Sequence, residues 1–301
     1  MTRLRTLYQV DVFTREPFAG NPAGVVLDAE GLTDTQMQKI ASELNNSETA
    51  FLFPPEGDDH DFVARFFTPT TEVPMCGHAT LGANYARAVE LGLSSVVARQ
   101  STKTGIIQVE VSKCDTRYRV AMVQHDIQIS PPVDELLVNE VMLSLGLAPS
   151  DLDDRCPVQV VSTGHSKLIV GLSSAAALDA IVPEFEKLAA IGREQKFAGY
   201  FVFTLDVPDA DLLAECRMFA PQIGIAEDPV TGNGNAPLGV YLVHNGLVPH
   251  DGQQLEFTSR QGRAMGRPGT ARVTVAIAEG KPLNVRVTAD VVTAFKGVIE
   301  I

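Results

Sequence analysis

Two short stretches combine polar side chains with a glycine-bearing turn, and each turn runs into a mostly apolar, helix-like segment. The first is Cys76-Gly77-His78-Ala79-Thr80, and the second is Glu227-Asp228-Pro229-Val230-Thr231-Gly232-Asn233-Gly234-Asn235. A glycine turn at a helix start leaves backbone N–H groups free at the positive end of the helix dipole. Both stretches are therefore candidate sites for an anionic group such as a substrate carboxylate.

Three titratable side chains near these turns suit acid–base chemistry. Glu48 follows Ser47 and precedes an apolar strand, and apolar surroundings raise a carboxyl pKa toward the range useful for proton transfer. His78 lies in the first turn of the first helix, and Asp228 precedes the second. Each has a simpler alternative: a surface glutamate, a histidine satisfied by the backbone, and a capping aspartate.

Neighbouring residues have less definite roles. Cys76 is either a thiolate at a helix start or an inert buried thiol. Glu227 suits a structural acceptor or a solvated carboxylate, whereas Asn233 and Asn235 tolerate the backbone angles of a turn. The arginines of residues 261–268 either meet a substrate carboxylate or pack between two repeats of the chain.

The sequence offers no support for a metal or a cofactor. No cysteine or histidine spacing typical of a zinc site occurs, and neither glycine turn matches a dinucleotide or phosphate-binding fingerprint. We therefore expect acid–base chemistry that uses side chains alone.

Composition narrows the class of protein. The chain has 301 residues, 45% of them hydrophobic, and a net charge of −13. The acidic balance with scattered Lys and Arg argues against nucleic acid and anionic membranes as partners. No signal peptide, membrane-length apolar run or disulfide spacing is recognised, so a cytoplasmic protein is expected.

The elements that must position these residues occur twice. Arg65-Phe66-Phe67-Thr68-Pro69 matches Arg217-Met218-Phe219-Ala220-Pro221, and a turn and an apolar helix follow each. The pattern predicts an internal duplication of about 150 residues. We expect one repeat over 1–125, completed by a final strand at about 289–301, and the other over 126–288. Repeats that face each other would bring the two turns into one cleft.

Local patterns predict further features. The first apolar helix should run from about 79 to 91 and end at Gly92. A loop is expected over 221–234, separate strands over 284–287 and 291–295, and a solvated acidic hairpin tip around His60.

Six ordered motifs across nearly the whole chain resemble the phenazine biosynthesis protein F (PhzF) family. They are Asp11-Val12-Phe13-Thr14, Gly20-Asn21-Pro22-Ala23-Gly24-Val25-Val26, Ser47-Glu48-Thr49-Ala50-Phe51, Cys76-Gly77-His78-Ala79-Thr80, Glu227-Asp228-Pro229-Val230-Thr231-Gly232, and Gln261-Gly262 with Met265-Gly266-Arg267-Pro268. The resemblance implies an α+β, diaminopimelate-epimerase-like fold. Such a fold has two pseudo-symmetric domains, each a barrel-like sheet around a central helix, with the site between them.

The resemblance also implies roles for individual residues. Glu48 would be the acid–base group, with His78 and Asp228 as its catalytic partners. The substrate-binding residues implied are Ser47, Gly77, Ala79, Thr231, Gly232 and Asn233. A homodimer that uses no cofactor and binds a small carboxylate substrate is expected. The second turn and the cysteine of the first depart from the phenazine enzyme and are typical of a broad branch of the family.

Three functions remain open. The leading hypothesis is a cofactor-independent isomerase that moves a proton on a small carboxylate-bearing substrate. An amino-acid racemase or epimerase is the second, although such relatives use two opposed cysteines and the second turn here has none. The third is a small-molecule-binding protein without catalytic activity on the same scaffold.

Overall fold

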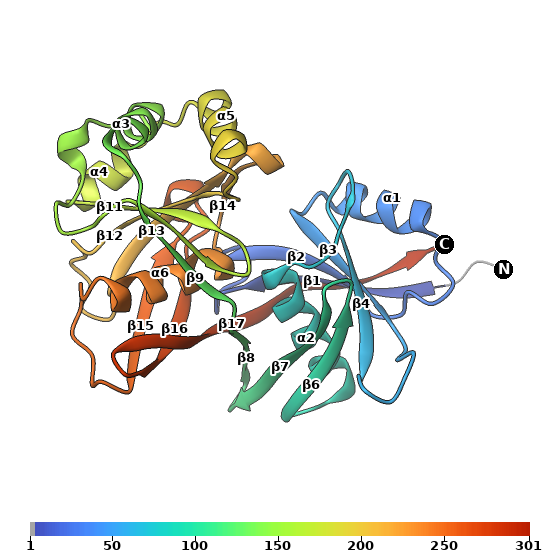
Figure 1. Cartoon of the computed structure of the whole chain (residues 1–301). Coiled ribbons are helices and arrows are strands. Elements are labelled where there is room, and N and C mark those ends of the chain that lie inside the picture. The colour runs from blue at the N-terminus through green and yellow to red at the C-terminus, as the bar shows by residue number, and fades with distance from the viewer. Residues whose placement is uncertain (1–3) are drawn as a thin grey trace. The chain divides into compact units, whose positions relative to one another are not determined.

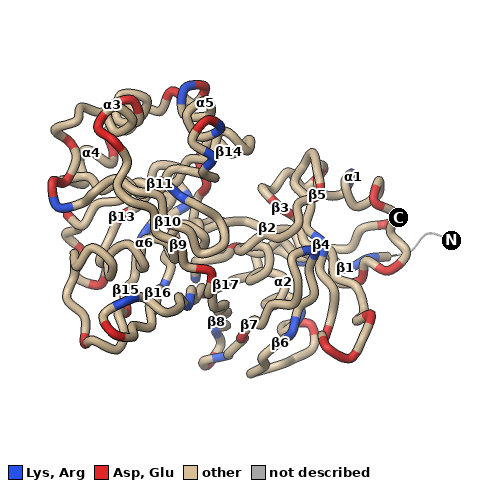
Figure 2. Tube along the Cα trace, viewed as in Figure 1, with Lys and Arg blue, Asp and Glu red and all other residues tan. Residues whose placement is uncertain are grey.

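The computed structural model describes residues 4–301, and its contacts divide them into two units, each described here by itself (Figure 1). Unit 1 holds the residues up to Met122 together with Thr288–Ile301, and unit 2 is Val123–Val287. Lys and Arg occur at isolated positions in both units rather than in one continuous stretch (Figure 2). Among the described residues, no helix is long and apolar enough to cross a membrane.

Unit 1 is a barrel of paired strands. Going round it, β17 pairs with β1, β1 with β2, β2 with β3, β3 with β4, β4 with β6, β6 with β7 and β7 with β8, and β8 closes on β17. The strands are β1 (Leu4–Val12), β2 (Asn21–Val26), β3 (Glu48–Phe53), β4 (Phe62–Phe67), the short β5 (Glu72–Val73), β6 (Ser95–Thr102), β7 (Gly105–Cys114), β8 (Arg117–Gln124) and β17 (Lys281–Glu300). The last two residues of β8 and the first seven of β17 belong to unit 2. Helix α1 (Asp34–Leu44) joins β2 to β3.

The central helix of unit 1 is α2 (Gly77–Leu91), which packs on β1, β2, β3 and β7. Its side chains are small or apolar on nearly every side, and burial of such a helix removes that surface from water. At Gly82 an added Cβ would lie 2.8 Å from Val10, so the strand approaches the helix closely. The helix ends as predicted at Gly92, whose φ of 66° is left-handed. It begins two residues earlier than predicted.

Unit 2 repeats this plan around α6 (Gly232–His244). The strands are β9 (Ile127–Pro132), β10 (Gln159–Thr163), β11 (Lys167–Leu172), β12 (Tyr200–Thr204), β13 (Ala214–Ala220), β14 (Ile225–Asp228), β15 (Gln254–Gln261) and β16 (Gly269–Ala278). Strand β9 pairs with β10, β10 with β11, β11 with β12, β12 with β13, β13 with β15 and β15 with β16. Short 3₁₀ turns occupy Pro149–Asp151, Pro221–Ile223 and Arg263–Met265.

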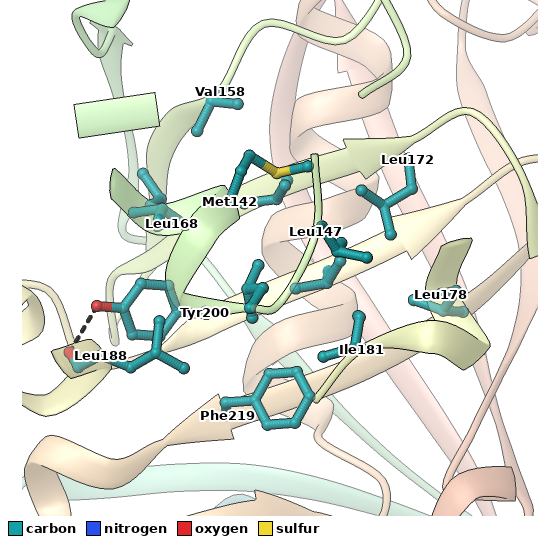
Figure 3. Close-up of a cluster of buried hydrophobic side chains, with 14 of the residues drawn as sticks. Met142, Leu147, Val158, Leu168, Leu172, Leu178, Ile181, Leu188, Tyr200 and Phe219 are labelled. Atoms are coloured by element: carbon teal, nitrogen blue, oxygen red, sulfur yellow. Dashed lines mark hydrogen bonds between the residues drawn. The ribbon is translucent and has the colours of Figure 1, made fainter. Parts of the chain in front are cut away.

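Three helices cover the outer face of this sheet: α3 (Glu135–Ser144), α4 (Ala175–Ala180) and α5 (Phe185–Gln195). Their apolar side chains pack with every second residue of β11, including Leu168 and Leu172, and with Tyr200 of β12 (Figure 3). The Tyr200 hydroxyl donates to the Leu188 carbonyl across this cluster. Because side chains alternate along a strand, the residues between these face α6 instead.

The two units share one strand topology. In each, an antiparallel hairpin is followed by a parallel strand, an antiparallel strand, the central helix and another parallel strand. The repeated arginines act alike: Arg65 bonds Glu72 at 2.8 and 2.9 Å, and Arg217 bonds Glu227 at 2.9 Å through two nitrogens. Glu227 is thus a structural acceptor. The internal duplication predicted from the sequence is present in the structure.

Several local predictions are wrong. The stretch 221–234 is not one loop, because it contains β14 and the first turn of α6, and Asn235 is a buried helix residue rather than a turn residue. The predicted solvated tip around His60 is also wrong, because the His60 side chain is buried. Its ring bonds Asp59 and accepts from the Glu56 N–H. The two strands expected over 284–295 are parts of the single strand β17.

Candidate active site

Glu48 is held at the start of β3 by the end of α1. Asn45 stops that helix in a left-handed conformation, with φ of 51°. The next residue, Asn46, exchanges two buried hydrogen bonds with Gln9 of β1, at 2.9 and 2.8 Å. These contacts fix the path of the chain just before Ser47, so Glu48 begins β3 at a defined place, and its side chain is buried.

His78 connects the polar residues at the start of α2. Its Nε2 lies 3.5 Å from a Glu48 oxygen and 3.3 Å from the Ser47 hydroxyl, and its Nδ1 lies 3.4 Å from the Cys76 sulfur. All except Ser47 are buried. A neutral ring protonated at Nε2 would donate toward Glu48 or Ser47 and accept from the thiol. The structure thus brings together two segments that are about 30 residues apart in the sequence, Ser47-Glu48 and Cys76-Gly77-His78.

The starts of both central helices lack a side-chain cap. Cys76 is the N-cap residue of α2 and Thr231 that of α6, and neither side chain accepts from its helix. The first N–H groups of each helix then have no acceptor within the helix. Gly77 is partly exposed and has no side chain to cover these donors, whereas Ala79 is completely buried and offers only its backbone.

Asp228 belongs to a second polar cluster, in unit 2. The Thr231 hydroxyl donates to the Asp228 carboxylate. Gln261 bridges the same segment, because its amide nitrogen donates to the Asp228 carbonyl at 2.8 Å and its oxygen accepts from the Thr231 N–H at 3.1 Å. The Thr231 hydroxyl therefore orients a carboxylate rather than capping its helix.

Gly232 and Asn233, the first two residues of α6, are both partly exposed. The Asn233 side chain is held from unit 2, since its oxygen accepts from Gln124 at 2.8 Å, and Gln124 in turn accepts from Thr163. Arg263 forms ion pairs with Asp179 and Glu215 of the same unit, so the expected packing between repeats does not hold for this arginine.

Lys167 is a residue of this cluster that the sequence analysis does not single out. It is only 3% exposed, although it is charged and opens strand β11. Burial lowers the pKa of Lys167 from 10.5 to about 8, and the Asp228 carboxylate opposes that change. Among the described residues 4–301, none accepts a hydrogen bond from its ammonium.

The topology places different side chains at corresponding positions of the two units. The repeated arginines align the two units: Arg65 pairs with Phe51, and Arg217 pairs with Val202. Three residues before each partner lie Glu48 in unit 1 and Gly199 in unit 2, so these two residues correspond. On the adjacent strand, Ala23 pairs with Glu48, and the corresponding residue is Lys167, next to Gly199. Each unit thus carries one buried ionisable group at this level of its sheet: a carboxylate in one and an ammonium in the other.

The helix starts correspond in the same way. Glu72 precedes Cys76 by four residues, as Glu227 precedes Thr231. The N-cap cysteine of one repeat is therefore a threonine in the other. Cys216, a further buried cysteine of unit 2, lies in β13, and burial raises the pKa of its thiol well above the usual range.

Glu48, Cys76 and His78 are also the residues that could hold a metal ion. Their ligand atoms lie within 4.8 Å of one another, and carboxylate, thiolate and imidazole are all zinc ligands. The sequence spacing gave no indication of this set, because Glu48 comes from a different element.

Comparisons with known proteins agree on one family. The family model described as "Phenazine biosynthesis-like protein" matches residues 10–297. An uncharacterised isomerase from Clostridium acetobutylicum is 45% identical over 296 residues, which cover 98% of both chains. The trans-2,3-dihydro-3-hydroxyanthranilate isomerase of Pseudomonas chlororaphis is 33% identical over 297 residues, covering 96% of this chain and 97% of that one.

Solved structures agree with this assignment. A PhzF-family protein from Bacillus anthracis has a TM-score of 0.87 at 29% identity, covering 99% of this chain and 100% of that one. A hydroxyproline epimerase from Agrobacterium vitis shares the fold, with a TM-score of 0.61 at 12% identity over 99% of this chain and 91% of that one. The expected α+β, diaminopimelate-epimerase-like fold is confirmed, and the protein is an isomerase. More particularly, the chain belongs to the PhzF family.

Proposed function

We propose that this isomerase moves a proton between two carbon atoms of a small carboxylate-bearing substrate, with Glu48 as the proton carrier. The observation that supports the proposal is the buried cluster at the start of α2, where His78 lies beside Glu48, Ser47 and Cys76. A base needs its acceptor atom held in place near the proton that it removes.

The proposed reaction moves a proton and a double bond within the substrate and leaves the atomic composition of the substrate unchanged. The Glu48 carboxylate takes a proton from one carbon, and the electron pair of the broken C–H bond delocalises into the adjoining unsaturated system. The protonated carboxyl then returns a proton to a second carbon, so that the double bond moves and Glu48 regains its charge. His78 holds the carboxylate and polarises the substrate during both steps.

The remaining predicted residues would bind and orient the substrate. Backbone donors at the starts of α2 and α6 suit its carboxylate, through Gly77, Ala79, Gly232 and Asn233. Asp228, held by Thr231, is proposed to orient a polar substituent on the substrate. The position of the site between the two repeats, expected from the resemblance, is part of this proposal.

Relatives suggest the first substrate to test. The Pseudomonas chlororaphis relative acts, by its name, on trans-2,3-dihydro-3-hydroxyanthranilate. At 33% identity and with a different second turn, this chain is proposed to take a compound of the same class, a small acid with an unsaturated carbon framework.

Two-thiol epimerisation is the second candidate, favoured by the contact between Cys76 and His78. Against it, the corresponding N-cap residue of α6 is Thr231, which is not a thiol.

The test of the proposed function is the Glu48→Gln variant, with Glu43→Gln as a control at an exposed position of α1. Glu48→Gln should lower kcat by at least about a thousandfold, with an unchanged thermal midpoint, because the amide cannot accept the proton. Glu43→Gln should be unaffected. Turnover by Glu48→Gln within tenfold of the wild type would refute the assignment.

A further inference from the structure

Lys167 occupies an unusual position for a lysine. Strand β11 places Leu168, Val170 and Leu172 on the outer face, in the apolar cluster that includes side chains of α3, α4 and α5. Leu168 and Leu172 are labelled in Figure 3. The alternation of a strand then turns Lys167 and Ile169 to the inner face, where α6 lies.

The pairing of strands shows which end of α6 Lys167 is near. Ile169 pairs with Phe201, whose ring packs so closely on Gly234, in the first turn of α6, that an added Cβ would lie 2.3 Å from it. Two residues further along β12, the Phe203 ring lies 5.8 Å from that of Tyr241, near the other end of the helix. Lys167 precedes Ile169 by two residues, so it lies beyond the start of α6.

Two independent features then favour an anion at this place. The start of α6 has no side-chain cap, because the Thr231 hydroxyl donates to Asp228 instead. Lys167, 97% of whose surface is buried (3% exposed), donates to no residue in the described part of the chain. A largely buried ammonium costs free energy even beside one carboxylate, Asp228, and a buried charged group next to an uncapped helix start is a candidate for binding an anion.

We propose that Lys167 is the specificity residue that recognises the substrate's carboxylate, together with the first N–H groups of α6. This inference rests on the proposed function, and it assigns the recognition of negative charge to unit 2. The Asp228 carboxylate attracts the Lys167 ammonium when no substrate is bound. It also repels an acid placed on its own side, so it restricts where the substrate carboxylate binds.

The duplication explains why only one unit carries such a lysine. Its counterpart in unit 1 is Ala23, which pairs with Glu48. A lysine at Ala23 would form an ion pair with Glu48 and lower the pKa of the proton carrier. Separating the ammonium and the proposed base into different repeats keeps both available to the substrate.

The experiment compares an acid with its neutral amide. Binding of 3-hydroxyanthranilate and 3-hydroxyanthranilamide is measured by calorimetry on the full-length protein and on its Lys167→Met and Lys167→Arg variants. The wild type should prefer the acid by about 10- to 100-fold, as expected for a charge-assisted hydrogen bond. Lys167→Met should reduce that preference to less than about threefold, whereas Lys167→Arg, which keeps the charge, should retain most of it.

The matched control is Lys187→Met, on the exposed face of α5, which should behave as the wild type. A Lys167→Met protein that keeps the full preference would overturn the inference, as would a wild type that does not prefer the acid. Glu48→Gln separates the two proposals, because it should lose turnover and still prefer the acid. An acid preference lost only in Lys167→Met supports the role of the lysine even if Glu48 proves dispensable.

Discussion

Replacing Lys167 with methionine should make the protein more stable at neutral pH, and the gain should disappear as the pH rises. The side chain is almost completely buried, and methionine is a similarly long, unbranched replacement. Burial lowers the pKa of Lys167 from 10.5 to about 8. A pKa difference of that size corresponds to about 3 kcal/mol, with the attraction to Asp228 already included.

The direction in which stability changes with pH follows from the number of protons that the folded and unfolded chains bind. Between pH 8 and 10.5 the unfolded chain still holds the proton that the folded chain has lost, so the free energy of unfolding of the wild type rises with pH. Below pH 8 both states are protonated and the full penalty is present. Lys167→Met carries no penalty at any pH. Its advantage should be about 3 kcal/mol at pH 7 and fall to within about 1 kcal/mol of zero near pH 10.5.

The assay is urea unfolding, followed by circular dichroism, of the wild type and of Lys167→Met at pH 7, 8.5 and 10. The difference in unfolding free energy between the two proteins is compared at each pH, because groups that the substitution leaves unchanged titrate alike in both proteins and do not affect that difference. Lys187→Met, at an exposed position, should show no such pH dependence. A stability difference that stays constant from pH 7 to 10 would refute the reasoning, whatever its size, because packing changes do not titrate.

Three further predictions follow from particular contacts. Cys76→Ala should keep turnover within about tenfold of the wild type, since the two-thiol route lacks a second cysteine; complete loss in a folded variant would favour a thiol base. Prolonged dialysis against a chelator should leave turnover unchanged, and a loss restored by zinc would show that Glu48, Cys76 and His78 bind metal. Gly234→Ala should destabilise the protein by about 1–3 kcal/mol, because its methyl group would overlap Phe201; an unchanged denaturation midpoint would show that Phe201 can move aside.

Much of the fold could be predicted because its signals are local or repeated. The matched arginines showed the duplication, and Gly92 marked a helix end through its left-handed backbone. The start of α6 was misplaced because the asparagines and glycines there are typical of turns, whereas burial against Phe201 and Gln261 makes them helical. Tertiary packing overrode local propensity at that point.

The sequence indicates candidate residues for the site but not the contacts between them. Glu48 and His78 were named from motifs, yet their distance of 3.5 Å depends on how β3 meets α2, which no local pattern encodes. The sequence does not single out Lys167, because a lysine between a turn and an apolar strand resembles a surface residue. Only the packing of Leu168 and Leu172 under the outer helices shows that Lys167 points inward.

The most direct test of Glu48 as the proton carrier is the exchange of substrate hydrogen with solvent. trans-2,3-Dihydro-3-hydroxyanthranilate is incubated in D₂O with the wild type, with Glu48→Gln and with Glu43→Gln, and deuterium in the recovered compound is located by NMR and mass spectrometry. With the wild type and Glu43→Gln we expect one deuterium at the carbon that receives the proton, and with Glu48→Gln we expect none. Equal incorporation by Glu48→Gln would contradict the assignment of Glu48 as the proton carrier.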